Sequence, residues 1–224
     1  MSGSRRCCAV LAIAAAAAAG CATTVVGHHE PGAAARQATD LNALLLTADE
    51  IDSAMNATGM AVDTTMSTLV DDSPYTTPEQ CLAVSSIGEE HVYAGSNWSA
   101  VRMQSLHEPG EDYAHLAHQA VVEFPTGADA AAFYTKSVGL WRSCTPGRYT
   151  YTPSGVTWDV GQVDDNAGML IASTNQQGEA WLCQRALTAA AAIVVDILTC
   201  SDDTTGALAT QRIARAIASR VAGQ

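Results

Sequence analysis

Seven cysteines are the residues of this chain whose type and spacing point most clearly to chemistry. No Cys-x-x-Cys pair occurs, and histidines are not interleaved at zinc-finger spacing, so zinc binding is the weaker interpretation. Three of the cysteines fall in the first 21 residues. In an exported chain, the even number that remains predicts two disulfide bonds. These four are Cys81, Cys144, Cys183 and Cys200.

Three disulfide pairings are possible for four cysteines. Residues 181–187 and 193–200 are neighbouring apolar segments that could form a β-hairpin, and Cys183 and Cys200 lie in them. A disulfide between adjacent strands needs little adjustment of the backbone. We therefore favour the bond Cys183–Cys200, which leaves the other two cysteines to pair with each other.

Residues 1–20 have the profile of a secretory signal peptide, with Arg5-Arg6 followed by about a dozen small apolar residues. The apolar stretch is shorter than the roughly 20 residues of a transmembrane helix. It ends in Ala18-Ala19-Gly20-Cys21, which resembles the lipobox of bacterial lipoproteins. This resemblance implies that the Cys21 thiol forms a thioether to diacylglycerol. The alternative is ordinary signal cleavage with Cys21 unmodified.

Residues 21–40 are rich in Ala, Thr, Gly and His and predict a flexible tether behind the lipidated N-terminus. Such a tether spans about 25 Å, so a domain over residues 41–224 would stay close to a membrane. We expect a lipid anchor through Cys21 at the extracytoplasmic face of the cell membrane. The general secretory route fits the arginine pair better than twin-arginine export, because the usual hydrophobic pattern does not follow it.

The net charge of −12 excludes one class of partner. An acidic surface repels phosphate backbones, so we expect no nucleic acid to bind. With 48% hydrophobic and 15% charged residues, the chain has enough apolar material for one domain with a sizeable core.

Secondary-structure signals after residue 46 predict an α+β domain. Thr47 and Glu50 form a capping box that begins a helix from about Ala48 to Asn56. Further helices are expected at 127–144 and 204–221, with short ones near 78–84 and 89–93. Without regular alternation of strands and helices, the strands predict an antiparallel sheet packed with helices. The expected strands cover 98–106, 116–124, 147–151, 156–163, 169–173, 181–187 and 193–200.

Motifs that would carry catalysis are missing from the sequence. It has neither a Gly-x-Ser-x-Gly elbow nor a Gly-rich phosphate loop. His115 and His118 fall on an expected strand, which does not present an i, i+3 pair on one side. The acidic doublets at 71–72, 164–165 and 202–203 lack a calcium-loop pattern and fit solvated turns. We therefore expect no catalytic residues, no metal and no cofactor.

Trp98 is the tryptophan with the most polar surroundings in the sequence, and Arg102 and Gln104 are among its neighbours. Core packing is the usual role of a tryptophan. The polar neighbours nevertheless make Trp98, Arg102 and Gln104 candidates to bind a small polar ligand.

Several stretches together are similar to the PknH-like extracellular domain, the sensor domain of a mycobacterial membrane serine/threonine kinase that also occurs in exported lipoproteins. The resemblance covers roughly residues 41–222 and implies a single α+β domain with an open cleft for a ligand. It also implies the pairing Cys81–Cys144 and Cys183–Cys200. Ala191-Ala192 depart from the family pattern, which has an Asn there. The stretches that carry the resemblance are 46–51, 78–81, 93–98, 101–104, 141–144, 183–187, 194–197 and Cys200.

Three functions fit these expectations. The first is a membrane-anchored lipoprotein whose sensor-like domain binds a small-molecule or cell-envelope ligand without catalysis. The second is a protein–protein interaction domain at the cell envelope. The third and weakest is an envelope-acting hydrolase with His107, His115 or His118 as the base.

Overall fold

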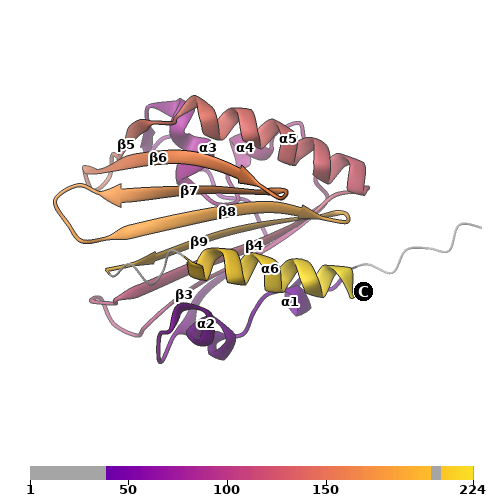
Figure 1. Ribbon diagram of the computed structural model, residues 1–224, viewed down its shortest axis with the longest axis horizontal. Helices are drawn as coiled ribbons and strands as arrows, with labels where there is room; N and C mark the ends of the chain where they lie inside the picture. Colours follow the sequence, from indigo (N-terminus) through magenta and orange to yellow (C-terminus); the bar gives the residue numbers. More distant parts are fainter. Residues whose placement is uncertain (1–38, 203–207, 224) are drawn as a thin grey trace, which may run out of the picture. The chain divides into compact units, whose positions relative to one another are not determined.

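A single nine-stranded antiparallel sheet organises the domain, with the strands in the order β1-β3-β4-β9-β8-β7-β6-β5-β2 (Figure 1). The computed structural model describes residues 39–202 and 208–223. The expected signal peptide, Cys21 and nearly all of the expected tether lie outside the described residues. The strands are β1 Ala61–Met66, β2 Thr76–Thr77, β3 Ala100–His107, β4 His115–Glu123, β5 Gly147–Tyr151, β6 Val156–Asn166, β7 Met169–Gln176, β8 Leu182–Ala190 and β9 Ile193–Ser201.

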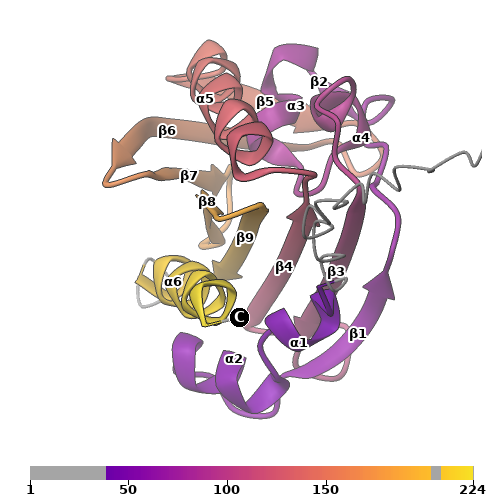
Figure 2. The same ribbon diagram turned by 90° about the vertical axis from the view of Figure 1, so that its right-hand side faces the viewer.

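Helices cover both faces of the sheet and enclose two apolar cores (Figure 2). One face is covered by α3, α4 and α5, and the other by α1, α2 and α6. None of the described helices is long and apolar enough to cross a membrane. Their bounds are α1 Leu41–Leu44, α2 Ala48–Met55, η1 Glu79–Cys81, α3 Leu82–Ser85, α4 Glu90–Tyr93, α5 Gly127–Ser143 and α6 Ala209–Ala222.

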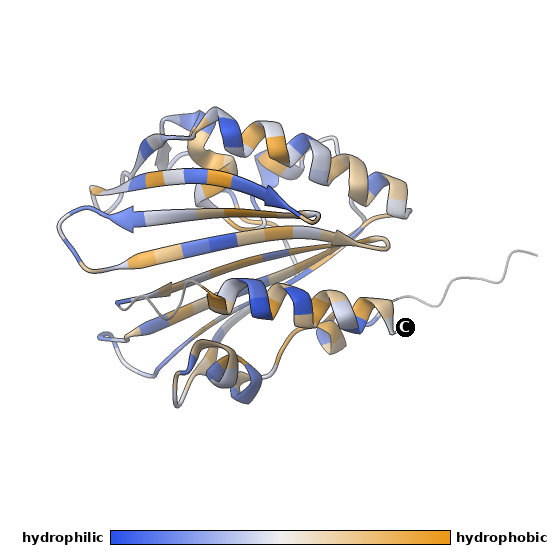
Figure 3. Cartoon of the chain, in the orientation of Figure 1, coloured by the Kyte–Doolittle hydropathy of each residue, from blue (hydrophilic) through white to orange (hydrophobic). Residues whose placement is uncertain are grey.

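The amphipathic helices form where the sequence predicts them. Thr47 and Glu50 make the expected capping box at the start of α2. The described part of α6 carries both hydrophilic and hydrophobic residues along its length (Figure 3). Its apolar stripe packs into the second core through Ile213 and Ile217, both buried. The α+β class with an antiparallel sheet is therefore confirmed.

Two elements of the sheet are absent from the sequence-based expectation. Strand β1 pairs with β3 at one edge, and five of its six residues are exposed. It therefore lacks the alternation of apolar and polar residues that signals a half-buried strand. Strand β2 has only two residues and joins the opposite edge next to β5. Both strands are held by main-chain pairing with a neighbouring strand, and the pattern of their side chains does not predict them.

A buried ion pair fastens the α3–α4 segment to the sheet. Arg185 on β8 donates from Nε and Nη2 to the two carboxylate oxygens of Asp196 on β9, at 2.9 and 2.7 Å. Its Nη1 donates to the carbonyl of Ala83 at 2.6 Å, while Asp196 accepts from the backbone N–H of Gly88 at 3.3 Å. The guanidinium also lies 4.9 Å from the ring centre of Trp141 on α5. One charged pair therefore joins two strands, α3, α5 and the segment between α3 and α4.

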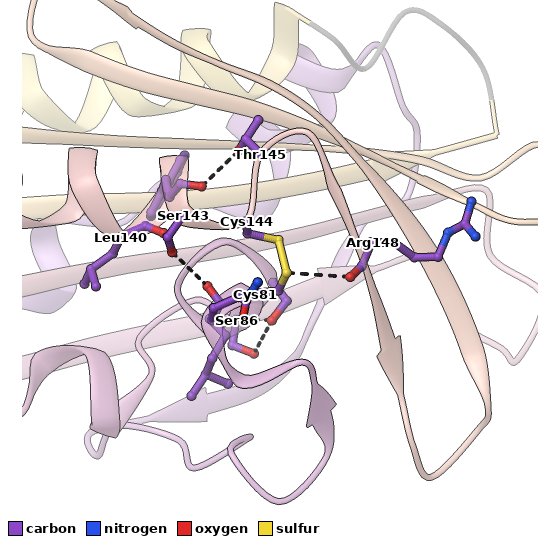
Figure 4. The surroundings of a disulfide bond; sticks show 11 residues. Cys81, Ser86, Leu140, Ser143, Cys144, Thr145 and Arg148 are labelled. Carbon is purple, nitrogen blue, oxygen red and sulfur yellow. Dashed lines mark hydrogen bonds between the residues drawn. A yellow bond between two sulfur atoms is a disulfide. The ribbon is translucent and has the colours of Figure 1, made fainter.

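Both disulfides have the pairing favoured from the sequence. Cys183 and Cys200 are directly opposite each other on β8 and β9, with their Cα atoms 4.0 Å apart. Cys81 and Cys144 join the end of η1 to the end of α5, where Ser143 also donates to the carbonyl of Gln80 (Figure 4). The Cys183–Cys200 bond lies within the sheet, whereas the Cys81–Cys144 bond ties η1 to α5.

Candidate functional site

Strand register brings residues from six strands into one strip across the face of the sheet that also carries α5. Leu116 on β4 is opposite Cys200, Cys200 is opposite Cys183, and Cys183 is opposite Thr174 on β7. Two residues further along β7, the strip continues as Gln176, Trp158 and Tyr149. Directly paired residues project to the same side of a sheet, so these side chains form a continuous floor.

The floor belongs to a cleft of about 450 Å³. Its walls come from the end of α3, from the segment that leads to η1, and from the loops that precede β4, β6 and β8. The volume falls within the range of small-molecule sites. Aromatic rings dominate the lining and come from Tyr113, Tyr149, Tyr151, Trp158 and Trp181.

These rings are held by contacts with one another. Tyr149 and Trp158 are stacked with their ring centres 6.3 Å apart, and Trp181 meets Tyr113 edge-on at 6.0 Å. Burial raises the pKa of Tyr149 to about 12, although a hydrogen bond with Thr174 acts in the opposite direction. The Tyr149 hydroxyl is therefore neutral at physiological pH, and with Thr174 and Gln176 it adds polar groups to the aromatic lining.

A second hollow of about 560 Å³ shares Tyr113, Gln176 and Trp181 with the cleft. Much of its lining is the loop between β3 and β4. Glu108 in this loop accepts from the backbone N–H of His115 and pairs with the His115 ring at 2.6 Å. Burial opposes ionisation of Glu108, yet its hydrogen bonds with His115 hold the pKa of that carboxyl below its ordinary value.

The three histidines named as candidate bases are packed against, paired with or buried by neighbouring residues. His107 lies against Tyr113 with the ring centres 4.5 Å apart, and its Nδ1 lies 2.7 Å from the carbonyl oxygen of Glu108. His115 is paired with Glu108. Burial, together with the nearby His107, lowers the pKa of His118 to about 4, so this ring is neutral at pH 7. None of the three lines the cleft or the adjoining hollow.

Asp71, Glu89 and His91 are the one group of potential metal ligands among the described residues, with ligand atoms within 4.8 Å of one another. The buried Glu89 carboxylate accepts backbone N–H bonds from Asp72 at 2.8 Å and His91 at 3.2 Å. Burial raises the pKa of Glu89 despite these bonds. The carboxylate thus joins the loop before η1 to the start of α4, a role that requires no metal.

The sequence-predicted residues Trp98, Arg102 and Gln104 lie apart from the cleft. Trp98 lies just ahead of β3 and packs against the first core. On β3, Gln104 accepts from Gln119, whose amide also donates to the carbonyl of Leu46 ahead of α2. Neither cleft nor hollow has any of the three in its lining. Their role in binding a ligand stays a prediction.

Core packing, the usual role of a tryptophan, describes only part of what Trp158 and Trp181 do: Trp158 packs against the first core. Both are only partly buried and line the cleft. The residues next to them in sequence, such as Asp159 and Leu182, carry no distinctive signal. The cleft depends on register between strands that are distant in sequence, so local composition could not identify it.

Comparison with known proteins supports a single family. The model of the PknH-like extracellular domain matches residues 37–220. The serine/threonine-protein kinases PknH of Mycobacterium bovis and Mycobacterium tuberculosis are 34% identical over 164 residues, which is 71% of this chain. The chain spans about a quarter of the length of these kinases, since the match covers 26–27% of them.

A solved structure agrees with the sequence comparison. The crystal structure of the extracellular domain of PknH from Mycobacterium tuberculosis superposes with a TM-score of 0.77 and 30% identity. The superposition covers 82% of this chain and 95% of that one, so nearly all of the solved domain has a counterpart here. The two disulfides of this chain fit the oxidising surroundings of an extracellular domain. The chain belongs to the PknH-like extracellular domain family.

Proposed function

We propose that this protein is a non-catalytic, sensor-like binding domain at the extracytoplasmic face of the cell membrane, and that the aromatic cleft holds its ligand. The aromatic cleft is the observation that carries this proposal. A volume of about 450 Å³ lined by five aromatic side chains and a few polar groups has the composition of a small-molecule site. Membership of a family of extracellular sensor domains supports the same function.

The surroundings of the histidines support the non-catalytic part of the proposal. His115 is paired with Glu108, and His107 lies against Tyr113. Neither imidazole reaches the cleft or the hollow. A general base must lie within hydrogen-bonding reach of its substrate, so these histidines are poorly placed to act on a molecule in the cleft.

We expect Trp181→Leu to weaken binding of any cleft ligand by at least tenfold. The substitution removes one wall of the cleft and the edge-on contact with Tyr113. A thermal-shift screen of cell-envelope metabolites identifies the ligand, and isothermal titration measures its affinity for the wild-type protein and the variant.

Trp98→Leu is the matched control, because Trp98 is also a partly buried tryptophan but does not line the cleft. Its affinity should stay within twofold of the wild type. Loss of binding in Trp98→Leu with retention in Trp181→Leu would move the site to the residues that the sequence predicted. Failure of every envelope compound to stabilise the protein would contradict ligand binding itself.

The membrane anchor is a second, independent part of the proposal. We expect Cys21→Ala to abolish incorporation of labelled palmitate and to shift the protein out of the membrane fraction. Each buried methylene contributes about 0.8 kcal/mol, so two or three acyl chains hold a protein firmly while none leaves it free. Cys8→Ala is the control and should remain labelled. Membrane retention of unlabelled Cys21→Ala protein would refute anchoring through this thiol.

A further inference from the structure

Charge is distributed unevenly around the aromatic cleft and its adjoining hollow. No lysine, arginine or histidine is among the described residues that line either space. The hollow carries four carboxylates, and Asp72 lines the cleft. None of these acidic groups belongs to an ion pair within the part of the chain that the structure describes. The four carboxylates are Glu111, Asp112, Glu179 and Asp202.

Two arginines on strands that contribute to the cleft are already paired with aspartates. Arg185 on β8 pairs with Asp196 and Arg148 on β5 pairs with Asp159, each at 2.7 Å. Lys136, the only lysine, donates to the carbonyl of Val92 on α4. Phosphate or carboxylate groups entering the cleft would therefore meet uncompensated negative charge.

The aromatic walls of the cleft and the four carboxylates of the hollow, here called the acidic rim, together fit one class of ligand. The faces of tryptophan and tyrosine attract cations, and rings around an ammonium group are the usual way that proteins recognise it. Tyr113 and Trp181 line both spaces, so a ligand seated between them touches rings on one side and lies near carboxylates on the other. Long-range attraction by the rim would also speed its entry.

We propose that the cleft binds a small organic cation carrying a quaternary or protonated ammonium group. This inference rests on the proposed function and names the chemical class of the ligand. The ligand binds in the cleft, and the nearby carboxylates make the cleft accept a positive rather than a negative group.

Three probes of nearly the same shape and different charge test the proposal. Choline is positive, 3,3-dimethylbutan-1-ol is neutral, and 3,3-dimethylbutanoate is negative. Each is titrated into the full-length protein while the indole N–H signals of Trp158 and Trp181 are followed by NMR. We expect choline to bind at least tenfold more tightly than the alcohol, which corresponds to about 1.4 kcal/mol. The anion should bind most weakly.

Neutralising the rim separates charge from shape. In Glu111→Gln/Asp112→Asn/Glu179→Gln, choline affinity should fall by about tenfold, while the affinity for the alcohol should not change. Raising the ionic strength from about 0.01 to 1 M shortens the Debye length from about 30 to 3 Å and should weaken choline in the same selective way.

A control with the same change in net charge is Asp49→Asn/Glu90→Gln/Asp164→Asn, three exposed acids outside both spaces. It should leave choline affinity within twofold of the wild type. Equal loss in both triple variants would show a general charge effect and overturn the proposal.

Two further results would also overturn the cationic ligand. Equal or tighter binding of the alcohol or the anion overturns the cationic ligand but leaves the cleft as a binding site. The same holds if no probe shifts the indole signals while an envelope compound binds with Trp181-dependent affinity. Failure of the metabolite screen as well would overturn the proposed function too.

Discussion

Asp196→Asn will lower the free energy of unfolding by about 3–5 kcal/mol, because it leaves Arg185 charged and buried without its partner. The side chains of Arg185 and Asp196 are 3% and 0% exposed, so water cannot replace the lost interaction. The same substitution weakens the attachment of Gly88, whose N–H donates to the Asp196 carboxylate. Urea denaturation of the oxidised protein measures the loss.

An exposed ion pair in the same sheet is the matched control. Arg148 and Asp159 pair at 2.7 Å across β5 and β6, with side chains 60% and 48% exposed. Asp159→Asn should shift the urea midpoint far less than Asp196→Asn does, because water screens the pair. Equal effects of the two substitutions would mean that burial does not govern the Arg185–Asp196 interaction. A double variant, Arg185→Met with Asp196→Leu, should recover much of the loss by removing the unpaired charge.

Removal of the Cys81–Cys144 bond by a double alanine variant will cost about 4 kcal/mol. The bond closes a loop with a sequence separation of 63 residues, and the chain-entropy model assigns about 4 kcal/mol to a loop of that length. Cys183–Cys200 closes a separation of 17 residues, for which the same model gives about 3 kcal/mol. Denaturation curves of the two double alanine variants measure both losses.

The two disulfide variants should also differ in function. Cys183 and Cys200 are in the cleft floor, whereas Cys81 and Cys144 lie outside its lining. Loss of the sheet disulfide should therefore weaken ligand binding under conditions where both variants remain folded. The expectation fails if Cys183→Ala/Cys200→Ala is the less stable variant, or if only Cys81→Ala/Cys144→Ala loses affinity for the ligand.

Local signals in the sequence were enough to predict much of the fold. The capping box of Thr47 and Glu50 located α2, and the apolar segments around Cys183 and Cys200 located the hairpin of β8 and β9. Both signals involve residues close together in the chain. Strand β1 was not predicted, because its exposed side chains have no apolar period and its position depends on pairing with a strand about 40 residues later.

The candidate site was harder to predict than the fold. Trp98 was chosen for polar residues close to it in sequence, but it lies ahead of β3 and packs against the core that contains Val101 and Met103. The cleft instead combines residues such as Tyr113, Trp158 and Trp181, which only the order and register of the strands bring together. A sheet in this strand order must be known before these side chains can be recognised as one surface.

The decisive measurement is a crystal structure of the full chain, grown with the envelope compound that gives the largest thermal shift. We expect ligand density between Trp158 and Trp181, above the Cys183–Cys200 bond, with the positive group of the ligand toward Glu111 and Glu179. Density beside Trp98, or on the opposite face of the sheet next to α6, would contradict it.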